Sequence, residues 1–126
     1  MCLQGASATN ALLQSAPNAK VKVFAIWEPI TFSDLTAPAD SVLHRITDSR
    51  VSQYYDSNHL VSKALQAQML TRGVTGQDQL VKNEYAWDTV AVYAAGVRWE
   101  NGAGAKPDFV GAPVVRVSER VAGYLM

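Results

Sequence analysis

The chain has 126 residues, of which 48% are hydrophobic and 17% charged, and 11 basic side chains balance 11 acidic ones. This length predicts a single domain, residues 1–126, with enough material for a hydrophobic core. A neutral chain without a Lys/Arg cluster argues against nucleic acid or an anionic membrane as its main partner. The first residues lack the basic region of a signal peptide, and no apolar run approaches the about 18 residues of a membrane span. We therefore expect a soluble, cytoplasmic protein.

The first half of the chain predicts a helix, a strand and a second, short helix. Residues 3–16 are rich in alanine and leucine and stop at Pro17, which is typical of a helix. Residues 21–27 form a nearly continuous apolar run, as expected for a parallel strand buried on both faces. Residues 28–37 have the composition of a loop, and Pro38 then opens the short helix.

The second half predicts one further helix and several strands. Residues 51–55 indicate a brief extended segment, and Asp56 or Ser57 caps a helix whose apolar side chains share one stripe: Leu60, Val61, Ala64, Leu65 and Met69. Residues 71–84 are expected to form a surface connection. We expect strands over 85–93 and 113–117, with 97–99 extending or pairing with the former, 101–107 as a glycine-rich loop, and Ser118 capping a final helical turn.

Several stretches spread over nearly the whole chain together carry a resemblance to other proteins. They are residues 22–30 (KVFAIWEPI), Asp34, residues 43–51 (LHRITDSRV), 53–56 (QYYD), 87–88 (WD), 96–99 (GVRW) and 111–117 (GAPVVRV). Together they resemble a group of uncharacterised bacterial thioredoxin-like proteins, in which a strand precedes a C-x-x-C motif and a glycine follows the second cysteine by three residues. Cys2 and Gly5 match that second cysteine and its glycine. The resemblance implies an α/β, thioredoxin-like fold, truncated at the N-terminus, with a mixed sheet flanked by helices.

Two features of that group have no counterpart here: the first core strand and the first, normally nucleophilic, cysteine. Thioredoxins proper also carry a cis-proline before the strand that faces the cysteines, and residues 83–87 contain none. We therefore expect a thioredoxin-like module that is not redox-active and that acts as a homodimer or by binding a small ligand. The alternative is a thiol-dependent oxidoreductase, or a remnant of one, with Cys2 as its catalytic residue.

Cys2 is the only cysteine, so the chain cannot form an internal disulfide. A thiol at the start of a helix is activated because the helix dipole stabilises the thiolate. Without a second cysteine, however, only mixed disulfides or adducts are open to it.

Loss of the first strand has a physical consequence, since that strand is central in the thioredoxin core. The strands at 21–27 and 85–93 would each be left with a row of unpaired backbone groups, which are costly to bury. Either these two strands pair directly, or a second copy supplies backbone partners through a swapped or augmented sheet. The low charge density favours the homodimer.

A ligand site is expected where the first strand ends. Glu28 follows that strand directly, and ligands gather at the carboxyl ends of strands in open α/β sheets. Aromatic rings and one carboxylate suit a small organic or cationic ligand, and the candidate residues are Trp27, Glu28, Asp34, Arg50, Tyr54 and Trp87.

Glu28, Asp34, Asp48 and Asp56 could also provide a carboxylate pair for acid–base chemistry. The interpretation that we favour is that Asp48 and Asp56 cap helices or turns and that Arg50 pairs with one of them. The two histidines, His44 and His59, fit no zinc-binding spacing, and no phosphate-binding fingerprint is present. We expect no metal and no cofactor, with His59 as a solvated surface residue.

Overall fold

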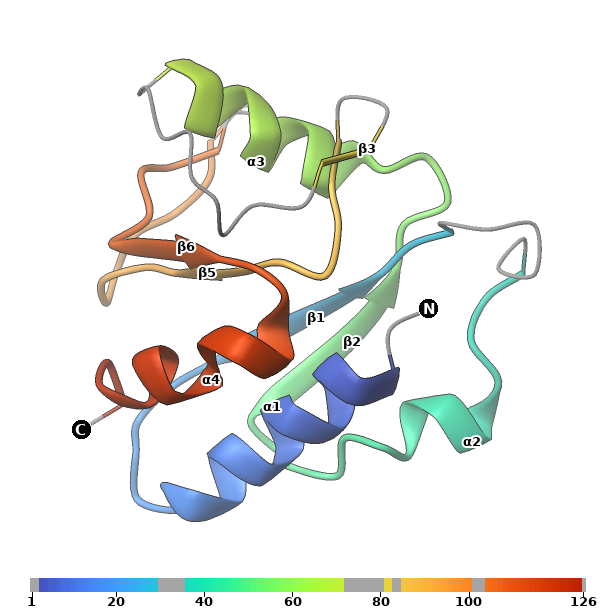
Figure 1. The fold of residues 1–126 in the computed structure, drawn as a ribbon, viewed down its shortest axis with the longest axis vertical. Helices are drawn as coiled ribbons and strands as arrows, with labels where there is room; N and C mark the ends of the chain where they lie inside the picture. The colour runs from blue at the N-terminus through green and yellow to red at the C-terminus, as the bar shows by residue number, and fades with distance from the viewer. Residues whose placement is uncertain (1–2, 30–35, 72–80, 83–84, 101–103, 126) are drawn as a thin grey trace.

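The computed structural model describes residues 3–29, 36–71, 81–82, 85–100 and 104–125 (Figure 1). The helices in this part are α1 (Leu3–Ser15), α2 (Asp40–Leu43), α3 (Leu60–Thr71) and α4 (Val114–Ala122). The strands are β1 (Val23–Trp27), β2 (Val51–Tyr55), β3 (Val81–Lys82), β4 (Tyr85–Ala86), β5 (Val90–Val92) and β6 (Phe109–Gly111). The chain is therefore a mixed α/β protein, as predicted.

The strands of the described residues form three separate two-stranded sheets. β1 and β2 are parallel, with Val23 opposite Val51 and Trp27 opposite Tyr55, whereas β3–β4 and β5–β6 are antiparallel. One continuous mixed sheet was expected, but no strand pairing joins β1 to β5 in this part of the chain. Direct pairing of these two strands, one of the two arrangements considered above, is therefore wrong.

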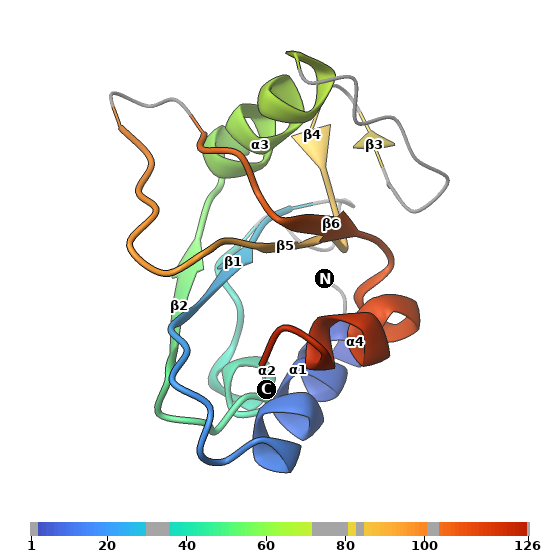
Figure 2. The same ribbon diagram turned by 90° about the vertical axis from the view of Figure 1, so that its left-hand side faces the viewer.

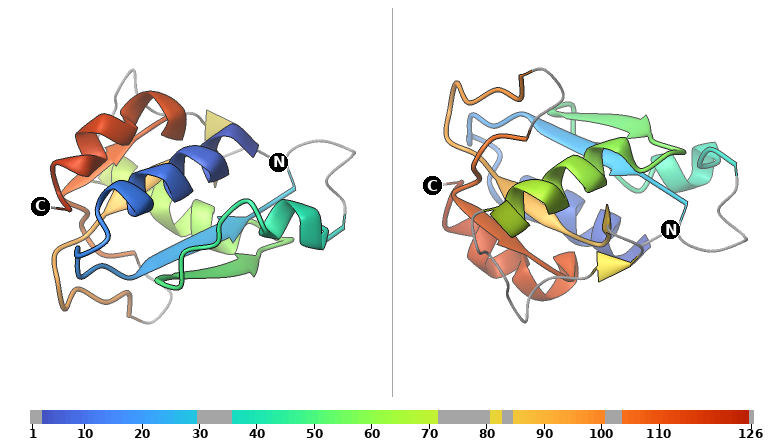
Figure 3. Two further views of the ribbon diagram at one scale, coloured as in Figure 1. Left: turned by 90° about the horizontal axis from the view of Figure 1, so that it is seen from below. Right: turned by 90° about the horizontal axis from the view of Figure 1, so that it is seen from above.

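Helices cover the strands from two sides (Figures 2 and 3). α1 and α4 pack against each other on one side, and α3 packs against β4 on the other. Most of the buried apolar side chains form three separate clusters, which are Ala6, Trp27 and Ile46; Leu65 and Ala86; and Phe109, Val117 and Val121. α1 contributes Ala6 to the first cluster and packs Leu12 against the third, so it connects the two largest parts of the core.

β1 is less buried than its apolar sequence predicts. Ala25 and Trp27 pack on the cluster around Ala6, whereas Phe24 is on the opposite face and is 60% exposed. Alternate side chains of a strand point to opposite faces, and the face of Phe24 is covered only in part, since Ile26 on the same face is partly buried. The expectation of a strand buried on both faces is therefore wrong.

The predicted strand over 85–93 is divided into β4 and β5. Asp88 between them has a φ of 48°, a left-handed conformation that aspartate tolerates better than most residues. The backbone N–H of Val114 donates to the Asp88 carbonyl at 3.1 Å, which ties this corner to the start of α4. Residues 97–99 lie outside strands, although Trp99 packs against the cluster of Leu65 and Ala86.

Residues 113–117 were predicted as a strand, but the structure has α4 there. The β-branched residues favour a strand locally, yet Val117 and Val121 lie one helical turn apart and bury against Phe109. Pro113 occupies the N-cap position with a φ of −70°, so the prediction of Ser118 as the cap is also wrong. The last strand, β6, comes earlier and ends at Gly111.

Other predicted elements are confirmed. The helix over 3–16 is α1, the extended segment at 51–55 is β2, and the helix after Asp56 is α3. The predicted apolar stripe of α3 is only partly buried, because Leu65 is buried whereas Leu60 is 66% exposed. Most of the predicted connection over 71–84 lies outside the described residues.

Candidate functional site

Two polar groups of side chains lie at opposite ends of the parallel pair β1–β2. Arg50 directly precedes β2 and Glu28 directly follows β1. Because the strands are parallel and five residues long, the two groups are separated by roughly 16 Å of strand. Glu28 and Arg50 therefore do not share a site.

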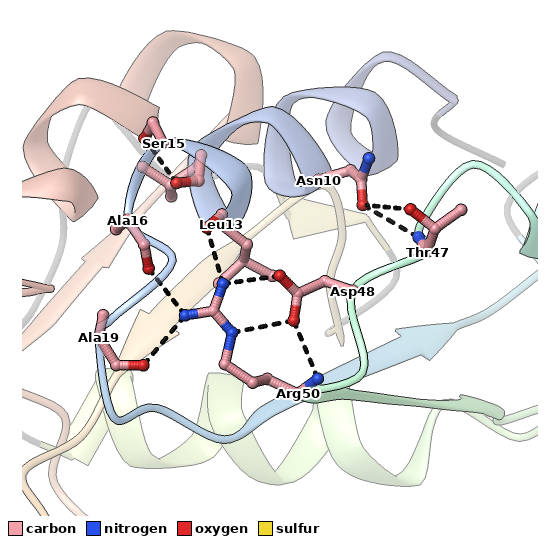
Figure 4. Close-up of polar contacts among 9 residues, drawn as sticks. Asn10, Leu13, Ser15, Ala16, Ala19, Thr47, Asp48 and Arg50 are labelled. Carbon is pink, nitrogen blue, oxygen red and sulfur yellow. Dashed lines mark hydrogen bonds and ion pairs between the residues drawn. The ribbon is translucent and has the colours of Figure 1, made fainter.

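Arg50 lies at the centre of the first group, which Figure 4 shows in detail. Its Nε donates to Oδ1 of Asp48 at 2.9 Å, and one Nη2 hydrogen donates to Oδ2 of Asp48 at 2.6 Å. The remaining guanidinium hydrogens donate to the carbonyl oxygens of Leu13, Ala16 and Ala19, at 2.7, 2.8 and 3.0 Å. All five N–H groups of the guanidinium are thus used within the chain.

The carbonyls that Arg50 binds belong to the last turn of α1 and the residues just after it. The Leu13 carbonyl lies in the last turn of the helix, at the negative end of its dipole, so a cation there stabilises the helix end. The side-chain hydrogen bond from Arg50, together with its backbone N–H, lowers the pKa of Asp48 from 3.8 to about 2. The pairing that we favoured from sequence is confirmed, and Asp48 raises the pKa of Arg50 in turn.

An open surface depression of about 480 Å³ borders this group and is lined by Leu13, Gln14, Pro17, Asp48, Ser49 and Arg50. Since every guanidinium hydrogen is already bonded, Arg50 has no donor left for a ligand in the depression. The Arg50–Asp48 pair is therefore a structural connection between α1 and β2. It is reinforced nearby by Asn10, whose Oδ1 accepts a hydrogen bond from the backbone N–H of Thr47 at 2.9 Å (Figure 4).

Glu28 lies at the centre of the second group. Its Oε2 accepts a hydrogen bond from Ser62 Oγ at 2.6 Å and lies 3.0 Å from Nδ1 of His59. The group is nearly buried, with 10% of the Glu28 side chain and 15% of the His59 side chain exposed. Ser62 lies in the first turn of α3 and His59 directly precedes this helix, whose dipole favours a negative charge at its N-terminus. This cluster of Glu28, His59 and Ser62 is hereafter the Glu28 cluster.

The segment between β2 and α3 fixes the position of His59. The Asp56 N–H donates to the Trp27 carbonyl at 2.7 Å, which extends the pairing of the strands by one residue. Oδ2 of Asp56 then accepts the backbone N–H of Val61 at 2.8 Å, so the predicted capping by Asp56 is confirmed. His59 has a φ of 57° and turns its ring toward Glu28. The prediction that His59 is a solvated surface residue is wrong.

The other candidate residues lie apart from this cluster. Trp27 is a core residue whose Nε1 donates to Oε1 of Gln53 at 2.9 Å. Tyr54 is 52% exposed on the outer face of the sheet, where its ring centroid lies 6.3 Å from that of Phe24. Asp34 and Cys2 lie outside the described residues.

Trp87, the remaining candidate, has a buried Nε1 without a hydrogen-bond partner. The same is true of Oε1 of Gln66 and of the Tyr93 hydroxyl. Burial raises the pKa of the Tyr93 hydroxyl, and the neighbouring Trp99 side chain partly offsets this rise. The rings of Tyr93 and Trp99 lie edge to face, with their centroids 6.2 Å apart. Trp87 does not contribute to the Glu28 cluster.

Sequence reasoning found Glu28 but missed His59 and Ser62 as its partners. The sequence does contain a local indication of this cluster. Glu28 directly follows a strand. His59 and Ser62 are three residues apart at the start of a helix, a spacing that places two side chains on one face. The sequence does not indicate that the start of α3 lies beside the end of β1, which brings these residues together.

No protein-family model, curated protein or solved structure matches this chain. Within the described ranges, none of the helices combines the length and apolar character that a membrane span requires. Likewise, no three histidine, cysteine, aspartate or glutamate residues of this part are grouped so that they could hold a metal ion.

Proposed function

We propose that the chain is a thioredoxin-like binding module without redox activity that works by associating with a second copy of itself. The observation that carries this proposal is the unpaired edge of β1. The Val23 N–H donates to the Arg50 carbonyl at 3.0 Å, and the Trp27 carbonyl accepts from Asp56. Val23, Ala25 and Trp27 therefore direct their backbone groups to β2.

The backbone groups of Phe24 and Ile26 must then point to the other edge of β1, since successive residues of a strand alternate in direction. That edge is on the side of β5 and β6 (Figure 2). Among the described residues, neither a strand nor a loop gives these two residues a backbone hydrogen bond there. An added strand from a second copy would satisfy both pairs of N–H and C=O groups.

Exposed aromatic surface supports the same conclusion. Phe24, on the strand with the unpaired edge, is 60% exposed. Two copies would meet without net repulsion, because the formal net charge of the chain is zero.

Light scattering coupled to size-exclusion chromatography tests the proposal. We expect Cys2→Ala in reductant to have twice the 13.6 kDa mass of one chain. Phe24→Lys should yield monomers, because an added strand would contact Phe24, whereas Tyr54→Lys should stay dimeric, because Tyr54 lies one strand away. A monomeric mass for Cys2→Ala at all concentrations would refute self-association. If Phe24→Lys and Tyr54→Lys lost the dimer to the same extent, strand addition at β1 would be refuted.

The same experiment distinguishes the alternative of a thiol-dependent oxidoreductase. That alternative predicts a monomer that dimerises only after oxidation and only when Cys2 is present. If the parent chain and Cys2→Ala are both dimers with and without reductant, Cys2 has no role in association.

A further inference from the structure

Gln66, on α3, has a buried side-chain oxygen without a hydrogen-bond partner in the described part of the chain. The residue is only 7% exposed, and its Oε1 accepts no hydrogen bond there. A buried amide oxygen that is left unpaired lowers the stability of the folded chain. Two further atoms of the described residues share this state, Trp87 Nε1 and the Tyr93 hydroxyl, but their residues are only partly buried. Gln66 is therefore the unpaired group that most needs an explanation.

The position of Gln66 on α3 places its side chain on the side of β1 that has the free edge. Gln66 follows Ser62 by four residues, so the two side chains leave the helix on the same face. Ser62 contacts Glu28, which directly follows β1. Leu65, the residue before Gln66, belongs to the cluster against which Ala91 of β5 packs. Seen from above, α3 lies between β1 and the β5–β6 pair (Figure 3).

A strand added to the free edge of β1 would bring backbone groups that need partners of their own. It would pair with Phe24 and Ile26, whose N–H and C=O groups point away from β2. Successive residues of a strand alternate in direction, so half of the N–H groups of the added strand would point away from β1. Buried N–H groups require an acceptor. Oε1 of Gln66 is a buried acceptor on this side of β1, and it is unused in the single copy.

We propose that Gln66 recognises the strand that a second copy adds to β1, with Oε1 accepting a hydrogen bond from one backbone N–H of that strand. This inference rests on the proposed self-association and goes further, because it assigns a side chain to the recognition of the strand. The unpaired oxygen destabilises a single copy, and the new hydrogen bond removes that penalty on association. The side chain thereby favours the associated form over the single copy.

Gln66→Met tests this role, because methionine is close to glutamine in shape but its thioether is only a weak acceptor. In the monomeric background Phe24→Lys, the urea midpoint of unfolding should stay the same or rise, since an unpaired buried oxygen is removed. In the Cys2→Ala background, the dimer dissociation constant from sedimentation equilibrium should rise about tenfold or more, since each copy loses a hydrogen bond. The same substitution thus maintains or stabilises the single copy and weakens the dimer.

Gln14→Met is the matched control, because Gln14 is exposed on α1. It should leave the urea midpoint unchanged and the dissociation constant within about twofold of its parent. A lower urea midpoint for Gln66→Met in the monomeric background, or a dissociation constant within about twofold of that of Cys2→Ala, would overturn the role of Gln66 while the dimer itself stands. A monomeric mass for Cys2→Ala at all concentrations would instead overturn the self-association, and the role of Gln66 with it.

Discussion

At the scale of single residues, Arg50 shows how one side chain can join two elements. Its guanidinium connects the end of α1 to the turn before β2 through Leu13, Ala16, Ala19 and Asp48. The planar fork of arginine makes this possible, since five N–H groups point in fixed directions. No other cationic side chain can replace all of these contacts.

We therefore expect Arg50→Lys to lower the thermal midpoint of unfolding, even though the charge is kept. A lysine has three donors on one atom and cannot bind both Asp48 oxygens and the carbonyls of α1 at once. Arg45→Lys is the control, because Arg45 makes only a long 3.4 Å contact with Ser7 on the surface. Equal midpoints for the two variants in circular dichroism melts would contradict this role of Arg50.

Asp48 predicts a pH dependence with a defined sign. Its pKa is about 2 in the folded chain and 3.8 when unperturbed, so its ionised form is favoured by folding. This stabilisation is fully present above about pH 4 and is lost as the pH falls toward 2. Urea midpoints measured across this range should fall more steeply for the parent than for Asp48→Asn, and parallel profiles would count against the prediction.

At the scale of elements, α1 packs against more than one part of the structure. It contacts α4, contributes Ala6 to the cluster of Trp27 and Ile46, and packs Leu12 against the cluster of Phe109. Leu13 is only 1% exposed and has the most complete burial of any large side chain in the described part. The helix therefore depends on apolar packing on more than one side.

Leu13→Ala should lower the free energy of unfolding by about 3 kcal/mol, because it removes a buried side chain and leaves a cavity. Leu60→Ala removes the same atoms from a side chain that is 66% exposed and should change stability by less than about 0.5 kcal/mol. Urea denaturation of both variants measures the difference. A loss of similar size in the two proteins would show that the burial of Leu13 does not govern stability.

The elements also show how far the sequence could predict the fold. α1, β2 and α3 were found because their local signals agree with their tertiary positions: alanine and a stop at Pro17, a short segment with one valine and two tyrosines, and a cap at Asp56. α4 was missed because its valines favour a strand locally, and burial against Phe109 decides in favour of the helix.

The candidate site was harder to predict than the elements. Glu28 could be found from its place after a strand, and Arg50 was expected to pair with Asp48 or Asp56, of which the structure has Asp48. The approach of His59 to Glu28 joins residues 31 positions apart and depends on where α3 begins relative to β1. No local pattern encodes that distance, and the carbonyl partners of Arg50 likewise come from packing.

At the scale of the whole molecule, the described part of the protein combines a divided core with an edge of β1 that has no backbone partner among these residues. The three apolar clusters are small; the first packs on β1 and β2, whereas the other two both contact β5 and β6. Folding of one copy alone leaves Phe24 exposed. Association of two copies would place this surface and the edge of β1 in an interface, so that stability and assembly become linked.

This linkage predicts a thermal midpoint that rises with protein concentration. For a folded dimer in equilibrium with unfolded chains, each tenfold increase in concentration stabilises the folded state by about 1.4 kcal/mol. Scanning calorimetry over two decades of concentration measures the effect, with Phe24→Lys as the control that should show none. A constant midpoint in the parent protein would contradict assembly through β1.

The division of the core also determines how the molecule opens. With three clusters that do not merge, the energy for local opening differs from one part to another, and each cluster can lose its order before the chain unfolds as a whole. Amide protons of α1 should exchange with solvent slowest, because that helix is shared by two clusters, and those of β3–β4 sooner. The protein would then unfold in stages, with α1 as the last element to be released.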